Sequence, residues 1–323
     1  MFKPFVIGSL ALATASLMLA DTEDSFRKSL PVESSKKLSL TVDFASIRVE
    51  GGATNNVELE AFFSGNPPSR KEFDRMMADF DFDIQRSGSD LRVKGEFKQG
   101  WKSVSLFGNF GHRYCHNGKC LEYEWLRRME IRARVPSQFA TDLRTSGGSI
   151  TVGDLSGEAT ARTSGGSLQF GHIDGPLNGE TSGGSITLLS GKGRAIVHTS
   201  GGGIRIDDMA GEVEAETSGG SIEIMRTSGR VTARTSGGGI HIGEAANAID
   251  AETSGGGITV AMRSSSKFDL DAATSGGGVT SEFQVIGDVN NSRHDHIRGT
   301  VNGGGPLLHL RTSGGGIHIR RVG

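Results

Sequence analysis

Residues 145–162 read TSGGSITVGDLSGEATAR, and the pattern returns six more times without a change of spacing. Its Thr-Ser-Gly-Gly quartets begin every 18 residues, at Thr145, Thr163, Thr181, Thr199, Thr217, Thr235 and Thr253. A period held over this many copies is typical of a solenoid, in which each repeat forms one coil stacked on its neighbour. The sequence therefore predicts long, regular surfaces, which suit binding or spacing better than catalysis.

Each repeat contains two segments of alternating apolar and polar residues, separated by turns. Ile150 and Val152 alternate with polar neighbours, residues 153–157 are turn formers, and residues 159–163 alternate again. This is the periodicity of two short strands joined by two turns. We expect an all-β parallel β-solenoid, or β-helix, with 18-residue two-strand coils about 4.8 Å apart. We also expect its glycines to adopt positive φ at tight corners.

Equivalent positions of successive repeats form four columns that we expect to face inward. Two columns contain large side chains and two contain smaller ones, which predicts a flat, thin core. The large columns are Ile150, Leu168, Ile186, Ile204, Ile222, Ile240 and Ile258, and Val152, Phe170, Leu188, Ile206, Ile224, Ile242 and Val260; the smaller are Ala159, Leu177, Ala195, Val213, Val231 and Ile249, and Ala161, Gly179, Val197, Ala215, Ala233 and Ala251. The Thr-Ser column of the quartets is expected to form a structural hydroxyl ladder, with threonine inside and serine at the corner, each bonding the next coil; ligand binding by these hydroxyls is the alternative.

The composition agrees with a thin core. Glycine accounts for 49 of 323 residues, and hydrophobic residues for only 35%. The formal net charge is −2, so the chain carries no electrostatic signature of nucleic-acid binding. Charges of both signs are dispersed, without a basic run that would favour an anionic membrane.

The first 20 residues have the pattern of a signal peptide. Lys3 precedes an apolar stretch over residues 5–19, small residues near Ala20 offer a cleavage site, and the chain turns acidic at Asp21. An uncleaved membrane anchor is the alternative, but the stretch is shorter than the roughly 20 residues that a spanning helix needs. The chain has no cysteine near the cleavage site, so the sequence gives no sign of a lipid anchor. We expect an exported protein, periplasmic or extracellular, with no membrane span after cleavage.

The chain then divides into an irregular N-terminal β region, residues 21–144, and the repeat solenoid, residues 145–323. Coil-like strands suggest that the solenoid begins near Leu38. A capping box and the apolar spacing of residues 73–80 predict a short helix over 69–80. A hairpin is expected to follow it. Near the C-terminus the quartet recurs at Thr274, 21 residues after Thr253, and at Thr312, with residues 288–298 expected as a loop.

An insertion over residues 98–125 holds both cysteines of the chain. They flank an Asn-Gly turn in Cys115-His116-Asn117-Gly118-Lys119-Cys120, a strong hairpin signal. The hairpin register places Cys115 opposite Cys120, within disulfide range. The alternative is a metal site that also uses His112 and His116. In an exported protein the disulfide is favoured.

The same insertion concentrates the aromatic side chains, including every tryptophan and tyrosine. Such residues are frequent at binding hot spots, and they equally suit a cap over an exposed solenoid end. A cap is the favoured interpretation, and a partner-binding surface is the more specific alternative. The residues are Trp101, Phe107, Phe110, Tyr114, Tyr123 and Trp125.

The exported chain with Arg-Thr-Ser-Gly-Gly-Ser-Ile units resembles the bacterial putative adhesin family, a domain of unknown function with β-strand repeats. The resemblance covers about residues 38–323 and rests on the repeats at 145–150, 235–240 and 312–317 and on the segment 298–306. It implies a solenoid with an adhesin-like role, and some relatives look linked to envelope stress responses. It implies no catalytic residue, and it does not extend to the cysteine and aromatic insertion.

An enzyme is the main alternative function. Polysaccharide lyases and hydrolases with a β-helix fold need clustered carboxylates. Three groups of residues invite that interpretation, but a solvated charged face or a polar loop explains each one more simply: Asp207 with Asp208; Glu212, Glu214 and Glu216; and His294, Asp295 and His296. We therefore expect a non-enzymatic binding module or envelope scaffold with no cofactor, metal or catalytic site. The sequence does not identify its partner; the candidates are an envelope glycan and a surface protein.

Overall fold

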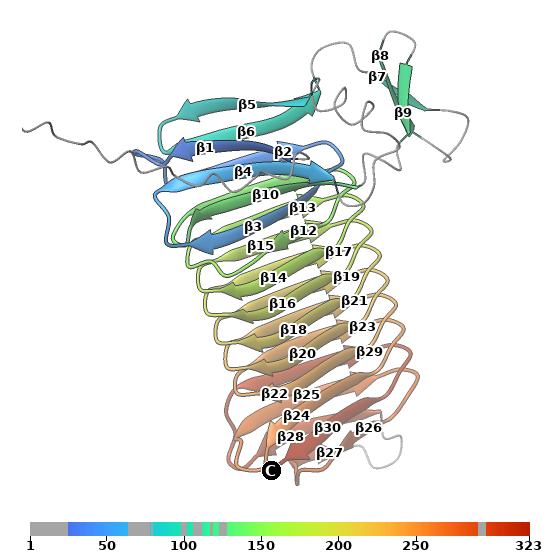
Figure 1. Cartoon of the computed structure of the whole chain (residues 1–323). Coiled ribbons are helices and arrows are strands. Elements are labelled where there is room, and N and C mark those ends of the chain that lie inside the picture. Colours follow the sequence, from blue (N-terminus) through green and yellow to red (C-terminus); the bar gives the residue numbers. More distant parts are fainter. Residues whose placement is uncertain are drawn as a thin grey trace, which may run out of the picture.

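The computed structural model describes residues 25–63, 78, 80–97, 102–105, 112–116, 119–122, 128–289 and 295–323. For residues 25–26, 62–63, 97, 102–105, 112–116, 119–122 and 288–289 it describes the backbone alone. The elements of these ranges are strands, which form two long sheets and one small sheet (Figure 1). The prediction of an all-β fold is confirmed.

Sheet A contains 13 strands in the order β1 (Ser25–Pro31), β4 (Asn56–Phe63), β10 (Met129–Pro136), β3 (Ser46–Gly52), β12 (Ile150–Val152), β14 (Leu168–Ile173), β16 (Ile186–Gly191), β18 (Ile204–Met209), β20 (Ile222–Thr227), β22 (Ile240–Ala245), β24 (Ile258–Arg263), β30 (Ile317–Val322) and β26 (Val279–Ser281).

Sheet B contains 14 strands in the order β27 (Ile286–Val289), β28 (His296–Val301), β25 (Phe268–Thr274), β29 (Leu307–Thr312), β23 (Ile249–Thr253), β21 (Val231–Thr235), β19 (Val213–Thr217), β17 (Ala195–Thr199), β15 (Leu177–Thr181), β13 (Ala159–Thr163), β11 (Ala140–Thr145), β2 (Lys37–Val42), β6 (Asp90–Phe97) and β5 (Phe80–Ser87). The small sheet contains β7 (Lys102–Ser105), β8 (His112–His116) and β9 (Lys119–Glu122).

The repeats form a stack of two-strand coils with the predicted register. Successive strands of each sheet pair in parallel, so that Ile186, Ile204 and Ile222 are direct neighbours in sheet A. All three are buried, and Ile204 is only 2% exposed. The inward columns of the two sheets form one continuous apolar core. The parallel solenoid predicted from the 18-residue period is therefore confirmed.

The quartet corner explains why threonine and glycine recur together. The Thr163 hydroxyl donates to the carbonyl of Gly148 in the preceding coil at 2.8 Å and accepts the N–H of Gly166 at 3.3 Å. A Cβ on Gly166 would lie 2.1 Å from that same carbonyl oxygen. The expected hydroxyl ladder is confirmed for threonine, but among the described residues no quartet serine hydroxyl bonds to a neighbouring coil. The expectation of positive φ is wrong for these corners, because none of the described quartet glycines adopts it. Glycine is needed there for the close approach of coils instead.

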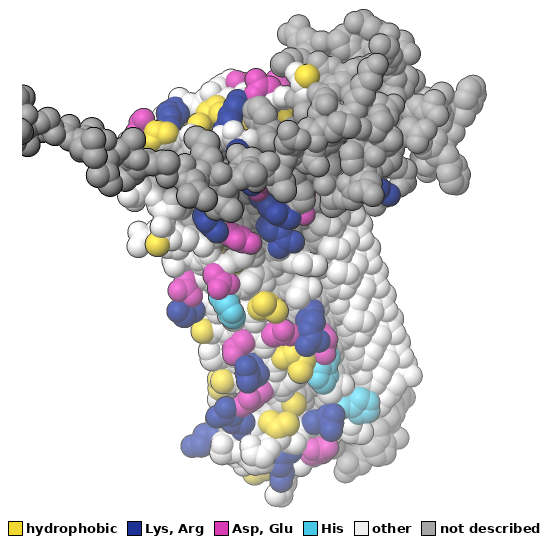
Figure 2. Space-filling view, in the orientation of Figure 1, with side chains coloured by type: hydrophobic (Ala, Val, Ile, Leu, Met, Phe, Trp, Pro, Cys, Tyr) yellow, Lys and Arg dark blue, Asp and Glu magenta, His cyan; other side chains and the backbone are white. Residues whose placement is uncertain are grey.

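Glycine serves the same purpose at the opposite corner. A Cβ on Gly211 would lie 1.9 Å from the carbonyl oxygen of Gly193 one coil earlier. Inside the core, Gly179 makes room for the largest side chain of its layer, because its Cβ would lie 3.1 Å from the ring of Phe170. Figure 2 shows the flank over the quartet corners as a nearly white strip, where serine, threonine and glycine lie beside the charged face of sheet A.

The last coil of the chain lies inside the stack, one position from its end. β29 and β30 pair in parallel with β23 and β24 on one side and with β25 and β26 on the other. The chain therefore skips one coil position after β24 and fills it later with residues 307–322. The extra residues in the 21-residue interval span this skipped position. The hydroxyl ladder runs through it, since Thr312 donates to Gly256 and Thr274 to Gly315, each at 2.7 Å.

The first coil of the chain is enclosed in the same way. β3 lies between β10 and β12, and β2 lies between β6 and β11, so later segments of the chain cover both sides of the coil. The chain crosses this coil as it passes from β10 to β11. Thr145 then donates to the carbonyl of Ala45, which takes the place of a quartet glycine, at 2.9 Å. Neither terminal coil can leave without breaking strand pairs on both sides.

The irregular regions confirm some expectations and correct others. The predicted hairpin is the antiparallel pair β5–β6. Phe80, assigned to the helix over 69–80, begins β5 instead, and the rest of that segment except Ala78 lies outside the described residues. The loop expected over 288–298 contains the ends of β27 and β28, which pair antiparallel. The signal peptide also lies outside the described residues, and no helix within the described part is long and apolar enough to cross a membrane.

The corner contact predicts opposite outcomes for two adjacent glycines. Gly166→Ala should lower the free energy of unfolding by about 2–3 kcal/mol, because its Cβ overlaps a carbonyl oxygen. Gly165→Ala should change it by less than about 1 kcal/mol, since its nearest neighbour would lie 3.5 Å away. Denaturant titration of both variants tests this, and equal losses would contradict the contact.

The enclosed C-terminal coil should exchange its amide hydrogens as slowly as the middle of the stack. β29 is hydrogen-bonded to strands on both sides, whereas an ordinary last coil would be open on one side. Hydrogen exchange of residues 308–312 should match that of residues 249–253. Leu310→Ala should lower the free energy of unfolding by about 2–5 kcal/mol, because Leu310 is fully buried. Fast exchange of β29 beside a protected β23 would refute the enclosure.

Asp271 on β25 should make the contact between β25 and the enclosed strand β29 sensitive to acid. Burial raises the pKa of its carboxyl, but hydrogen bonds from Arg311 at 2.7 Å and His296 at 3.2 Å outweigh burial and lower it overall. A lowered folded-state pKa contributes stability above the unfolded value of about 3.9, and that stability is lost as the pH falls through the folded value. Asp271→Asn should therefore unfold more easily at pH 7, and its deficit should shrink below about pH 4. A deficit independent of pH would contradict this role.

Candidate functional site

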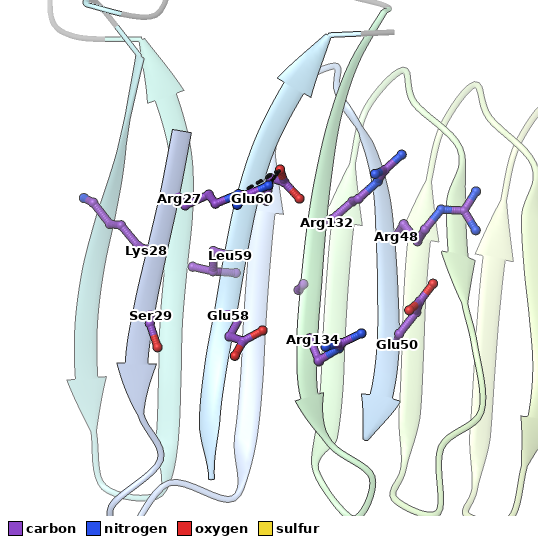
Figure 3. Close-up of a pocket in the computed structure, with 11 residues that line it drawn as sticks. Arg27, Lys28, Ser29, Arg48, Glu50, Glu58, Leu59, Glu60, Arg132 and Arg134 are labelled. Carbon is purple, nitrogen blue, oxygen red and sulfur yellow. Dashed lines mark hydrogen bonds and ion pairs between the residues drawn. The ribbon is translucent and has the colours of Figure 1, made fainter. Parts of the chain in front are cut away.

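A charged groove lies on the outer face of sheet A, at the end of the stack that contains β1. Four neighbouring strands line it, in the order β1, β4, β10 and β3, and its volume is about 810 Å³ (Figure 3). Alternation along each strand places one residue in the core and the next in the groove. Glu58 and Glu60 thus face outward on β4 while Leu59 between them is buried.

The first row of groove side chains is rich in arginine. Register places Arg27, Glu60, Arg132 and Arg48 side by side on the four strands. Arg27 donates to Glu60 at 3.0 Å. Arg132 and Arg48 are directly opposite each other, and both donate through Nε to one carboxylate oxygen of Glu130, at 2.9 and 3.2 Å. Like charges opposite each other destabilise a sheet, so this shared carboxylate offsets a local cost.

The second row alternates in sign and remains unpaired. Glu58, Arg134 and Glu50 are register neighbours on β4, β10 and β3, and Arg134 lies between the two carboxylates in Figure 3. Within the described part of the chain, no hydrogen bond or ion pair reaches their side chains, which are all exposed. This row therefore presents two acceptors and one donor group to solvent.

In the repeat coils, most outward charges form ion pairs with charges on adjacent coils or strands. Outward charges of opposite sign on adjacent coils approach each other, as in Arg162 with Glu180 at 3.2 Å and Arg226 with Asp208 at 3.0 Å. Arg162 and Glu180 lie on sheet B and Arg226 and Asp208 on sheet A, whose outer face carries interspersed acidic and basic side chains in Figure 2. Such exposed pairs contribute little stability each. Most charges of the repeat strands have such partners, although Glu158 and Arg230, next to the coil turns, have none within the described part of the chain. The second row of the groove differs because it gathers three such charges on adjacent strands.

Most of the residues considered for catalysis belong to such surface pairs; Asp295 does not, since within the described part of the chain only its backbone carbonyl is hydrogen-bonded. Asp207 pairs with Arg205 at 2.8 Å, Asp208 with Arg226, and Glu216 with His198 at 3.6 Å. Glu212 and Glu214 share Arg194. His296 lies beside Asp271, while His294 lies outside the described residues. Among the described side chains, no three His, Cys, Asp or Glu residues converge as a metal site would require.

The aromatic and cysteine residues singled out in the sequence fall where no side chain is described. The side chains of Trp101, Phe107, Phe110, Tyr114, Tyr123 and Trp125 lie outside the described residues, so their role as a cap or a binding surface stays a prediction. The backbone of β8 and β9 does pair Cys115 with Cys120 and His116 with Lys119, which confirms the predicted hairpin register. The disulfide itself stays a prediction, because neither sulfur atom is described.

Sequence reasoning missed the groove because its residues come from separated segments. The alternations Arg48-Val49-Glu50, Glu58-Leu59-Glu60 and Arg132-Ala133-Arg134 are each visible as half-buried strands. Their side-by-side order depends on β10 lying between β4 and β3, and on β4 running antiparallel to β10. No period in the sequence encodes that order.

The chain was compared with curated proteins and with solved structures. No curated protein matches the chain. Solved structures match at low identity, each over nearly its whole length: a "putative adhesin" from Parabacteroides merdae (12% identity, 94% of this chain and 98% of that one, TM-score 0.43), a second "putative adhesin" from Bacteroides fragilis (11%, 93% and 98%, TM-score 0.39), and a "Putative lipid binding protein" from Parabacteroides distasonis (13%, 94% and 98%, TM-score 0.40).

One family model matches most of the chain. It is Toastrack DUF4097, and the match extends over residues 35–320, which include the enclosed first coil, the repeats and the enclosed last coil. This extent agrees closely with the range over which the Thr-Ser-Gly-Gly units resemble the adhesin family, so that resemblance is confirmed. The chain belongs to the Toastrack DUF4097 family.

Proposed function

We propose that this protein is an exported binding module of the cell envelope, and that its partner binds in the groove on sheet A. The observation that carries the proposal is the row Glu58, Arg134 and Glu50: three charged side chains on adjacent strands that line one groove and have no partner in the described part of the chain. Strands on a continuous core hold these side chains, and rigid positioning of this kind favours binding. The signal-peptide pattern of residues 1–20 supports export.

A non-enzymatic role fits this site better than the alternative, a carbohydrate-active β-helix enzyme. A glycoside hydrolase needs two carboxylates, one of which stays protonated because it is buried. Glu50 and Glu58 are the groove carboxylates that have no ion-pair partner in the described part of the chain, but both are exposed and Arg134 lies between them. A pure scaffold, the other alternative, would leave the unpaired row without a purpose.

The test is a screen of the full-length protein, processed by its host, against cell-wall and surface glycans, scored for binding and for cleavage. Arg134→Ala should weaken binding at least about tenfold, because it removes a charged donor group from the groove. Arg205→Ala is the matched control, since it removes an exposed arginine from the same face within the repeats. It should leave binding unchanged.

Three outcomes would decide against the proposal. Binding that survives Arg134→Ala would place the partner elsewhere, and cleavage lost in Glu50→Gln or Glu58→Gln would favour the enzyme. Retention of the protein in the cytoplasm, with residues 1–20 still attached, would exclude export.

A further inference from the structure

The groove has no net charge preference, although arginine is its most conspicuous residue. Its two rows, with the carboxylate that both Arg132 and Arg48 contact, hold four arginines and four glutamates: Arg27, Arg48, Arg132 and Arg134, and Glu50, Glu58, Glu60 and Glu130. Lys28 also lines the groove, but its ammonium group donates to Asp81 on β5 at 2.8 Å. A strongly anionic or cationic ligand therefore gains no overall electrostatic attraction here.

The unpaired row discourages charged ligands more specifically. An anion that approached Arg134 would also approach Glu58 and Glu50, which occupy the adjacent strands about 4.8 Å away on either side. A cation that approached either glutamate would meet Arg134 at the same spacing. Each favourable contact with a charged ligand thus brings a repulsive one of similar size.

A hydroxyl group avoids this conflict because it both donates and accepts. Hydroxyls can donate to the carboxylates of Glu58 and Glu50, and others can accept from the guanidinium of Arg134. Hydrogen bonds to charged groups are about twice as strong as neutral ones, so a ligand that forms all three satisfies the row at once. The ligand best matched to an acceptor–donor–acceptor row is one that carries many hydroxyls and no charge.

We propose that the groove binds a neutral glycan laid across β4, β10 and β3. This inference rests on the proposed function and names the partner of the same site. The strand spacing of about 4.8 Å is close to the length of one pyranose ring, so consecutive sugars would meet Glu58, Arg134 and Glu50 in turn. Arg48 adds donors in the adjoining row, because it binds Glu130 through Nε alone and is 43% exposed.

Three kinds of oligosaccharide test the inference: neutral glucan and mannan, acidic oligogalacturonate, and basic chitosan. The full-length protein should bind a neutral oligosaccharide and neither charged one. Its affinity should change less than about twofold between 0.05 and 0.5 M salt, a range over which charge-driven binding falls steeply. Glu58→Ala, Arg134→Ala and Glu50→Ala should each weaken binding about tenfold or more. Glu223→Ala on the repeat face should not, and unchanged melting would exclude misfolding.

The other outcomes separate the two proposals. If oligogalacturonate or chitosan binds in the groove, with steep salt dependence and loss in Arg134→Ala or Glu50→Ala, the neutral-glycan inference is wrong and the binding module stands. If a neutral glycan binds equally well to all three groove variants, the inference is wrong and the groove is not the binding site. If no oligosaccharide binds, the inference fails, and a partner protein whose binding depends on Arg134 would still satisfy the proposed function.

Discussion

The stack depends on one contact repeated between coils: a corner carbonyl of one coil against a glycine of the next. Where Gly148 meets Gly166, a Cβ would lie 2.1 Å from the carbonyl oxygen, and the Thr163 hydroxyl donates to that oxygen at 2.8 Å. Buried carbonyls need donors, and coils at strand spacing leave no room for a side chain at this point. Threonine and the second glycine of each quartet are thus two parts of one contact. This contact recurs once in each coil, and the quartet that forms it therefore recurs once in each 18-residue repeat.

A stack held in this way has only nearest-neighbour interfaces, so its ends are its weak points. Both terminal coils are enclosed between coils contributed by other segments. Antiparallel strands cover three of the four sheet ends, since β1 lies beside β4, β5 beside β6 and β27 beside β28. The fourth ends in β26, which has only three residues. Short or covered edges keep a sheet from pairing with other chains. The coils formed by the two ends of the chain are thus not the outermost coils of the stack, and loss of either requires strands to separate on two sides.

The repeat made most of this fold predictable, because a constant period fixes both register and facing. Ile186, Ile204 and Ile222 align in one buried column, as expected from their spacing alone. The positions of the terminal coils could not be predicted, because Thr312 carries the same quartet whether its coil is last in the stack or enclosed. The 21-residue interval before Thr274 was the available signal, and a local insertion explained it equally well. The groove was hidden for a related reason: its rows form between strands whose order follows no period.

The charged groove lies where the repeat stops. In the repeats, residue i faces residues i−18 and i+18 in the adjacent coils, and opposite charges in these columns form pairs such as Arg205 with Glu223. The strands β1, β4, β10 and β3 come from distant segments of the chain, and some of them pair antiparallel. The side chains of each groove row are therefore not fixed by the 18-residue repeat. Places where a chain departs from the regular pattern of its fold are expected to be functional, because stability alone does not require the departure. The repeats supply a long rigid support, and the irregular end carries side chains that remain available to a ligand.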